Sequence, residues 1–334
     1  MRTPFLLFAL VAILIVMAAP SARAGLVAYY PFDADNAVDL SGNTNDGTVG
    51  GSVTFTTETP LASGKAMETT DRGGAYVVTV PTSPSLEAIS DEVTVAFWMK
   101  AGTAGQSNWF RIFQHANEGG GTQGWLINRY SSSDETNIRV DTIGQFNQNL
   151  AEGVNPGTLD DQWHHMVYTL DSDSGTWEEY ADGARATGPY NHGLGFSNTR
   201  PLYIAGRNDT GQYIGLLDDV AVWDERLDTA QARSLYTVPN DLGLDYDLAD
   251  VAALWAIHAA GSTGSGVIDG LPWHFTDLLP GSTTLGDAYI SNGTMYLVLG
   301  NGTGVAAVPE PSTFVLAALG LLGLACFGWR RRPR

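Results

Sequence analysis

The chain has 334 residues, of which 17 are basic and 36 acidic, so its formal net charge is −19 at neutral pH. A negative field of this size repels nucleic-acid phosphates and anionic lipid headgroups, which excludes both as expected partners and leaves divalent cations as candidates. An acidic surface that only aids solubility would explain the same charge. The single cysteine, Cys326, lies in an apolar run near the C-terminus. Stability must therefore come from a large buried core rather than from disulfides.

The first 24 residues have the composition of a secretory signal peptide. Arg2 precedes an apolar stretch over residues 5–19, and Ala22 and Ala24 form the small-x-small pattern of a signal peptidase site. The pattern predicts that residues 1–24 are removed by signal peptidase. The mature chain would then begin at Gly25 and be exported.

Residues 25–237 are predicted to form one all-β domain. Asp182-Gly183 is a typical hairpin turn, and Gly, Asn, Asp, Ser and Pro clusters separate short segments with period-two alternation. Many short strands at near-regular spacing predict a sandwich of two antiparallel sheets. The alternating segments are residues 75–80, 93–100, 125–130, 164–170 and 201–207.

Two adjacent histidines lie in the segment WHHMVYTLD, residues 163–171. Alternation places His165 and Val167 on one face and His164 and Met166 on the other, so one histidine is expected to pack between the two sheets. A metal or proton-transfer site is the alternative. We disfavour it because no Cys, Asp or Glu lies at ligand spacing beside the pair.

The pattern becomes helical after Asp228. Residues 229–236 predict a short helix with Asp228 as its N-cap, and residues 247–261 predict a second helix with an apolar stripe. The residues that follow are rich in Gly, Ser and Thr, with strand-like pieces between them. Residues 238–307 therefore form either a small accessory β-module or a semi-ordered spacer.

Residues 308–334 combine three features in a fixed order: a Pro-Glu-Pro motif, an uncharged run over residues 314–329, and an arginine cluster. A helix over that run would reach about 24 Å, slightly short of the roughly 30 Å hydrocarbon core of a bilayer. Arginines directly after an apolar run mark the cytoplasmic side of a membrane segment. We predict a short transmembrane helix at residues 314–329. The flanking residues are Pro309, Glu310, Pro311, Arg330, Arg331 and Arg332.

This tail resembles the PEP-CTERM sorting domain of exported bacterial proteins. The resemblance implies that an exosortase, a membrane protease-like enzyme, recognises and processes residues 308–334. It also implies an inner-membrane intermediate held by the C-terminal helix, followed by transfer to the cell surface or to the extracellular matrix.

Five segments follow one another in a fixed order: residues 25–49, 93–102, 124–130, 163–183 and 214–236. Together they resemble the LamG-like, concanavalin A-like lectin/glucanase domain. The resemblance covers residues 25–237 and implies an all-β, two-sheet antiparallel jelly-roll sandwich.

The first and last of these segments carry several acidic residues. A carboxylate in the middle of an apolar strand costs several kcal/mol unless its charge is matched. Calcium binds about six to eight hard oxygens of the kind that both segments supply. We therefore expect a structural calcium ion, and the alternative is that these side chains only cap turns. The expected ligands are Asp33, Asp39, Asn43, Asp218 and Asp219.

The sequence does not favour an enzyme. Retaining glycosidases need two carboxylates about 5 Å apart on one face of a strand, and glucanases of the resembled type carry a Glu-x-Asp-x-(x)-Glu strand. The nearest run here, Glu178 to Asp182, lies against the hairpin turn. A serine elbow, an HExxH motif and a phosphate loop are also absent from the sequence.

The main hypothesis is an exported, non-catalytic binding or adhesion protein, with polysaccharide or matrix as its ligand. Loop aromatics could stack on sugar rings, although packing in the core or at the rim would explain the same residues. A structural surface or matrix component without a specific ligand is the alternative function, and a glycoside hydrolase is a weaker one. The candidate aromatics are Trp109, Phe110, Trp125 and Tyr190.

Overall fold

The structure is a computed structural model. The predicted signal peptide, Tyr190 and everything after residue 299, including the predicted transmembrane helix and sorting motif, lie outside its described residues. Within the described residues no helix is long and apolar enough to cross a membrane. The described residues are 25–61, 64–71, 77–116, 124–129, 136–142, 145–149, 157–189, 198–206, 211–259, 266–268, 270–276, 284–291 and 293–299.

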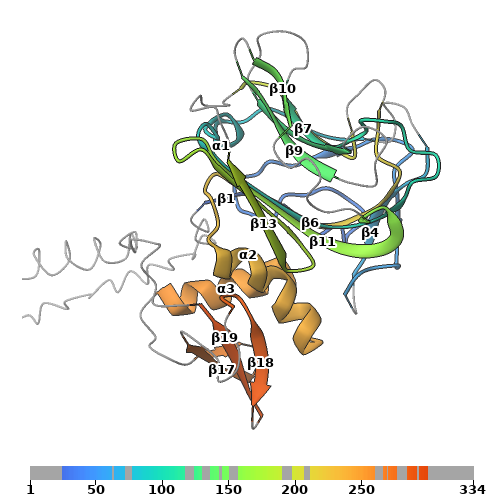
Figure 1. The fold of residues 1–334 in the computed structure, drawn as a ribbon. Helices are drawn as coiled ribbons and strands as arrows, with labels where there is room; N and C mark the ends of the chain where they lie inside the picture. The colour runs from blue at the N-terminus through green and yellow to red at the C-terminus, as the bar shows by residue number, and fades with distance from the viewer. Residues whose placement is uncertain are drawn as a thin grey trace, which may run out of the picture.

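Two antiparallel sheets lie face to face, as the sequence predicts (Figure 1). The first sheet contains β1 (Leu26–Tyr30), β3 (Thr54–Thr56), β4 (Ala66–Thr69), β6 (Glu92–Gly102), β11 (Asp160–Asp171), β12 (Thr176–Ala181), β13 (Ala184–Pro189) and β15 (Gly215–Trp223). The second contains β2 (Thr48–Val49), β5 (Val78–Val80), β7 (Arg111–Ala116), β8 (Gly124–Arg129), β9 (Thr136–Thr142), β10 (Gln145–Asn149) and β14 (Leu202–Ile204). A short helix, α1 (Pro84–Glu87), joins β5 to β6.

The strand order in the first, eight-stranded sheet is β13-β12-β11-β6-β15-β4-β3, and β1 pairs with the second half of β15. The seven-stranded sheet has the order β10-β9-β8-β7-β14-β5-β2. The predicted hairpin is confirmed, because Asp182 and Gly183 join β12 to β13 and both adopt positive φ angles.

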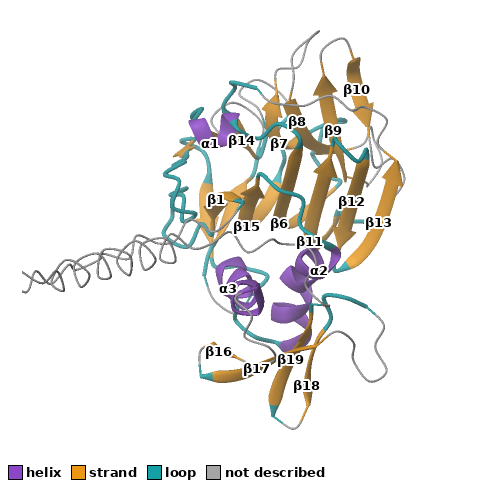
Figure 2. Ribbon diagram, turned by 90° about the vertical axis from the view of Figure 1, so that its left-hand side faces the viewer, coloured by secondary structure: helices purple, strands orange, loops and turns teal. Residues whose placement is uncertain are grey.

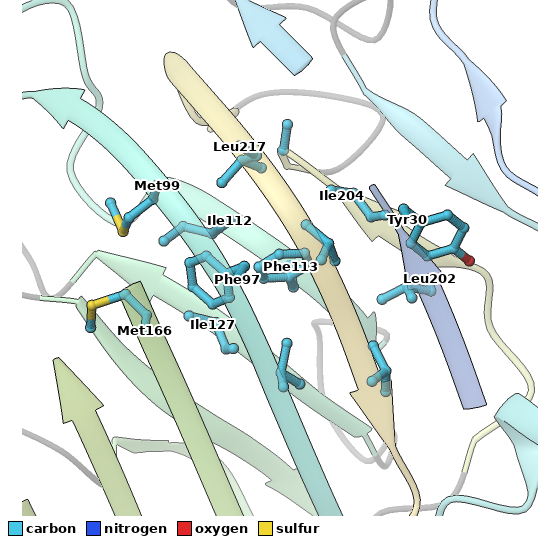
Figure 3. Packing of buried hydrophobic residues seen from close by; sticks show 14 of the residues in the cluster. Tyr30, Phe97, Met99, Ile112, Phe113, Ile127, Met166, Leu202, Ile204 and Leu217 are labelled. Atoms are coloured by element: carbon cyan, nitrogen blue, oxygen red, sulfur yellow. The ribbon is translucent and has the colours of Figure 1, made fainter. Parts of the chain in front are cut away.

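The main core lies between the two sheets and is built by alternation along each strand. Phe97 of β6 is at its centre, with its ring centroid 4.7 Å from that of Phe113 and 6.1 Å from that of Tyr168 (Figure 3). Ile127, Met166 and Leu217 surround these rings from β8, β11 and β15, and all are fully buried. Such close packing of aromatic and branched side chains fixes the distance between the sheets.

A second structural unit follows the sandwich, and we name residues 229–299 the C-terminal module. It begins with α2 (Thr229–Tyr236), which Asp228 caps together with Gln231 in a capping box, as predicted. A π-helical turn, η2 (Thr237–Asp241), and α3 (Leu248–Ala259) follow. A four-stranded sheet of order β16-β17-β19-β18 completes it, with β17 and β19 parallel. Its strands are β16 (Gly266–Ile268), β17 (Leu271–Thr276), β18 (Ala288–Ser291) and β19 (Thr294–Val298).

The C-terminal module packs on the outer face of the eight-stranded sheet (Figure 2). Tyr29 and Trp223 on that face belong to the same apolar cluster as Leu235 of α2, Val251 of α3 and Trp273 of β17. For residues 238–307 the sequence allows either a small module or a spacer. The described part of this region contributes to a second core. This core continues directly into the sheet of the sandwich.

The position of the histidine pair corrects one prediction. His165 is buried, but it packs against Trp98 and Tyr236, with ring centroids at 4.9 and 6.2 Å. It therefore lies between the eight-stranded sheet and α2 rather than between the two sheets. The alternation along β11 is as predicted, with Met166 facing the main core and Val167 the second core. The error arose because both faces of β11 are covered.

Candidate functional site

The two outer faces of the sandwich differ in chemistry. The C-terminal module covers the outer face of the eight-stranded sheet, whereas the seven-stranded sheet carries a row of polar residues on its outer face. Leu202 and Ile204 of β14 point into the main core, so Tyr203 between them points outward. Register pairs Tyr203 with Gln114 on one side and with Thr79 on the other.

This row, which we name the polar band, is interrupted at β8, because the partner of Gln114 on β8 is the fully buried Leu126. Beyond a bulge in β7, register pairs Arg111 with Asn128 on the same side. The members of the band are Thr48, Thr79, Tyr203, Gln114, Arg111 and Asn128. Exposure falls along the band. Thr48 is exposed, Tyr203 is half-buried, and Gln114 and Asn128 are only 5% and 0% exposed.

Two amide oxygens lie at the buried end of the polar band. The side-chain nitrogen of Gln114 donates to the Ala116 carbonyl at 3.0 Å, and that of Asn128 donates to the Arg129 carbonyl. Among the residues that the structure describes, Gln114 Oε1 and Asn128 Oδ1 accept no hydrogen bond. A buried acceptor without a donor costs about 1–3 kcal/mol. Because both oxygens are buried, the members of the band that a ligand can reach are Thr48, Thr79 and Tyr203.

The predicted ligand-binding aromatics fall into different environments. Trp125 and Phe110 are fully buried in the main core, so neither ring can meet an extracellular ligand and this part of the prediction is wrong. Trp109 is half-buried at the start of β7, and its φ angle of 61° is rare for a bulky residue. Tyr190 lies outside the described residues.

A second cluster of interest is the pair Asp218 and Asp219 in β15. Register shifts between Asp218 and Ala221, and Asp219 has a φ angle of 48°, which marks a β-bulge. Asp218 is paired with Trp98, whose ring faces α2, and Asp219 accepts a 2.7 Å hydrogen bond from the hydroxyl of Tyr29. The bulge thus turns both carboxylates toward the C-terminal module.

The electrostatics of this pair are unfavourable for two charges. Burial raises the pKa of Asp218 well above its usual range, and the charge of Asp219 raises it further. Burial also raises the pKa of Asp219, where the hydrogen bond from Tyr29 lowers it and the charges of Asp247 and Asp33 raise it. Among the described residues, neither carboxylate forms an ion pair.

Two of the five predicted calcium ligands have other partners. Asp39 accepts four hydrogen bonds at 2.8–2.9 Å, from the backbone of Tyr29, Ser41 and Asn45 and from the Ser41 hydroxyl. The Asn43 amide donates to the Leu26 and Val27 carbonyls at 2.8 and 3.1 Å. Both side chains hold the first loop against β1, as the turn-capping alternative proposes.

The other three predicted ligands are Asp33, Asp218 and Asp219. Asp33 is exposed and accepts a 2.9 Å hydrogen bond from the backbone of Lys65. In the part of the chain that the structure describes, no group of three or more His, Cys, Asp or Glu side chains could hold a metal ion. The residues thus do not assemble the predicted five-ligand site, and calcium binding stays a prediction.

The carboxylates nearest to a glucanase motif do not form a catalytic pair. Glu178 and Glu179 are adjacent on β12 and point to opposite faces of the sheet. Both are buried, and Glu178 is held by Arg226 at 2.9 Å, by Arg185 and by the Tyr180 hydroxyl. Hydrolysis would require two accessible carboxylates on one face.

His164 does have acidic neighbours, contrary to the sequence interpretation. Its Nδ1 lies 2.7 Å from Asp182 and its Nε2 lies 3.0 Å from Asp160. Asp182 comes from the β12–β13 hairpin, which the sequence spacing around the histidine could not reveal. The hydrogen bond to Asp182 has the largest effect and raises the pKa of His164. Partial burial lowers the pKa by less, and the hydrogen bond to Asp160 raises it further.

We expect the substitution His164→Gln to destabilise the protein mainly at low pH. A histidine with a raised folded pKa stabilises the fold below its unfolded pKa, and this contribution is lost as pH rises through the folded value. Urea unfolding should show a loss of up to about 1 kcal/mol near pH 5 and almost none near pH 9, because the site is partly exposed. His274→Gln, at an exposed histidine, serves as control. An equal loss at both pH values would contradict the assignment.

Comparisons with known proteins agree with this architecture. Residues 71–233 match the model of the concanavalin A-like lectin/glucanases superfamily, and residues 307–332 match the PEP-CTERM protein-sorting motif. The chain carries a concanavalin A-like domain followed by a PEP-CTERM sorting motif. The PEP-CTERM motif indicates an exported protein and implies processing by an exosortase. No curated protein matches the chain.

Solved structures resemble the concanavalin A-like domain at low sequence identity. The binding domain of Paraclostridial Mosquitocidal Protein 1 is 18% identical, with a TM-score of 0.49, and the match covers 64% of this chain and 52% of that one. Domain 4 of the GH43 arabinanase AbnA from Geobacillus stearothermophilus is 17% identical, with a TM-score of 0.49, and the match covers 64% of this chain and 99% of that one. Botulinum neurotoxin type C is 14% identical, with a TM-score of 0.50, and the match covers 64% of this chain and 51% of that one. The chain thus spans about half the length of both toxin chains.

Proposed function

We propose that this is an exported, non-catalytic carbohydrate-binding protein that acts at the cell surface or in the extracellular matrix. Signal peptidase would remove residues 1–24, and an exosortase would process the tail around Pro309, Glu310 and Pro311. The membrane would be a partner only before processing, through residues 314–329. The family match and the sorting motif support this assignment.

The observation that carries the binding proposal is the accessible part of the polar band, where the half-buried Tyr203 lies between Thr79 and Gln114. Tyr203 offers a ring for stacking on a sugar, and its hydroxyl and those of Thr48 and Thr79 can bond to sugar hydroxyls. Trp109 at the start of β7 is a further candidate contact. Botulinum neurotoxin type C, which shares the fold, interacts with ganglioside molecules.

The buried, oppositely directed Glu178 and Glu179 support the non-catalytic part of the proposal. A retaining glycosidase needs a proton donor and a nucleophile on the same side of the substrate. In the described residues, the carboxylates of β12 lack this arrangement. Asp218 and Asp219 share a side of β15, but they are 5% and 8% exposed and lie under the C-terminal module.

The test is a glycan array probed with the full chain in a mild detergent, with and without calcium. The substitution Tyr203→Ala should weaken binding of any captured glycan about three- to tenfold, as expected for the loss of one stacking ring. Tyr203→Phe keeps the ring and should stay within about twofold of the wild type.

The control is Leu40→Ala, at a residue that is 60% exposed on the loop between β1 and β2 and is not a member of the polar band, and it should bind as the wild type does. Binding that Tyr203→Ala leaves unchanged would move the site away from the polar band. An array without any captured glycan, in both conditions, would favour a structural surface component without a specific ligand.

A further inference from the structure

The four-stranded sheet of the C-terminal module has one buried and one open face. Trp273, Met295, Leu297 and Ala288 belong to the second core and face the helices. The residues that alternate with them lie on the opposite side, away from α2 and α3 (Figure 2). This open face lies outside the concanavalin A-like domain.

Three aromatic rings form a row across the open face. Register pairs His274 of β17 with Tyr296 of β19, and Tyr296 with Tyr289 of β18. The ring centroids of His274 and Tyr296 are 5.4 Å apart with an interplanar angle of 24°, and those of Tyr296 and Tyr289 are 4.7 Å apart at 19°. The rings therefore stand side by side on neighbouring strands.

The end of this aromatic row is accessible to a ligand. β18 is the edge strand of this sheet, and no other strand of the described residues covers the outward face of the Tyr289 ring. His274 is exposed, and Tyr289 and Tyr296 are half-buried. A ring face flanked by two phenolic hydroxyls and an imidazole offers both stacking and hydrogen bonds.

The charge distribution restricts the ligand class. The strands β16 to β19 contain no Asp, Glu, Lys or Arg, although the whole chain has a net charge of −19. A polyanion would be repelled by the chain and would find no basic residue on these strands. A cationic partner would find no carboxylate on them, and Asp287, which precedes β18, is already paired with Arg233 at 2.6 Å. The face is complementary to an uncharged ligand that displays hydroxyl groups and C–H surfaces.

We propose that the row His274, Tyr296 and Tyr289 binds a neutral polysaccharide, with a sugar ring stacked on Tyr289. This second site has the ligand class of the proposed function but rests on other residues. The C-terminal module and the polar band are on opposite sides of the sandwich, so one chain would contact polysaccharide at two separate places.

Affinity electrophoresis of the full chain in detergent gels that contain hydroxyethylcellulose, xylan or dextran tests the proposal. At least one of these neutral polysaccharides should retard the wild type. Tyr289→Ala should reduce that affinity about three- to tenfold, as expected for the loss of one stacking ring. Tyr289→Phe should stay within about twofold of the wild type, because it keeps the ring.

The matched control is Ile290→Ala, which changes the neighbouring residue of the same strand at a side chain that is 52% exposed. Ile290 pairs with Met295 and belongs to the other face, so binding should not change. The melting temperature of each variant shows whether the module is intact, and Tyr289→Phe tests the ring if Tyr289→Ala unfolds.

Three results would overturn the proposal. The first is that none of the polysaccharides retards the wild type, and the second is that wild type and Tyr289→Ala bind with equal affinity. The third is a dimer in sedimentation that Tyr289→Ala abolishes, because a second copy of the chain would then occupy the aromatic row. Tyr203→Ala in the same gels separates the two sites. If only this variant loses binding, the aromatic row is excluded and the proposed function stands. If only Tyr289→Ala loses binding, the polar band is excluded as the binding site.

Discussion

A chain that comprises only residues 25–236 is expected to unfold at a much lower temperature than one that comprises residues 25–299. The shorter chain lacks most of the C-terminal module, so Tyr29, Val167 and Trp223 on the outer face of the eight-stranded sheet become exposed. Each such side chain contributes about 1.5–3 kcal/mol when buried. We expect a loss of about 5 kcal/mol or more, which corresponds to about 10–20 °C in a domain of this size.

Differential scanning calorimetry of the two chains measures this difference. The chain of residues 25–299 removes only the tail and is the control for truncation itself. The predicted domain boundary at residue 237 passes through the second core, because α2 lies on one side of it and Trp273 on the other. Equal melting temperatures would show that the module docks without stabilising the sandwich.

The second large effect is a fall in stability with rising pH that depends on Asp218 and Asp219. Their folded pKa values are raised above the unfolded value of 3.8. The folded state therefore binds more protons than the unfolded state from about pH 4 up to the raised values, so stability decreases across this window. Between about pH 5 and pH 8 we expect a loss of about 2–4 kcal/mol, equivalent to holding roughly one extra proton.

The substitution Asp219→Asn should remove much of this pH dependence. Its amide oxygen can still accept the hydrogen bond from Tyr29, but it carries no charge. The variant should therefore be more stable than the wild type near pH 8 and similar to it near pH 5, as urea unfolding at both values would show. A pH profile of Asp219→Asn parallel to that of the wild type would contradict the assignment.

The same measurement tests the calcium prediction. A calcium ion beside Asp33, Asp218 and Asp219 would favour the charged carboxylates, so added calcium would raise the melting temperature near pH 8 and flatten the pH dependence. EDTA would reverse both effects. If the melting temperature is the same in calcium and in EDTA, protons rather than calcium neutralise the pair.

The elements that depend on local sequence could be predicted well. Alternation identifies strands such as β6 and β11, and the Asp-Gly pair fixes the turn between β12 and β13. Asp228 followed by Gln231 forms a capping box that needs no tertiary partner. In each case the interacting residues lie within a few positions of one another, so the pattern contains the whole signal.

The parts that depend on distant residues could not be predicted. The bulge at Asp219 is visible only in the register of β15 against β6, and the docking of the C-terminal module decides that His165 faces a helix. Asp182, which lies 2.7 Å from His164, comes from the β12–β13 hairpin. Sequence spacing could not show which carboxylates remain available for calcium.

Strand alternation in the sequence already separates core positions from outward-facing ones among the candidate binding residues. Alternation in β8 puts Trp125 on the same face as Ile127, which predicts a core position, and puts Asn128 on the other face. The same alternation in PLYIAG identifies Tyr203 as outward-facing. In RIFQHA it does not decide the side of Gln114, because a bulge puts both Ile112 and Phe113 in the main core. Polar residues between core positions of neighbouring strands were therefore better candidates than loop aromatics.

The shared core between the first strand and the last imposes an order of events on an exported chain. Tyr29 of β1 and Leu297 of β19 belong to one apolar cluster, although they lie near opposite ends of the mature sequence. During N-terminal-first translocation, the sandwich reaches the outside before the residues that cover it. The apolar outer face of its eight-stranded sheet then stays exposed to aggregation until β19 has crossed the membrane. A chaperone would act during this interval.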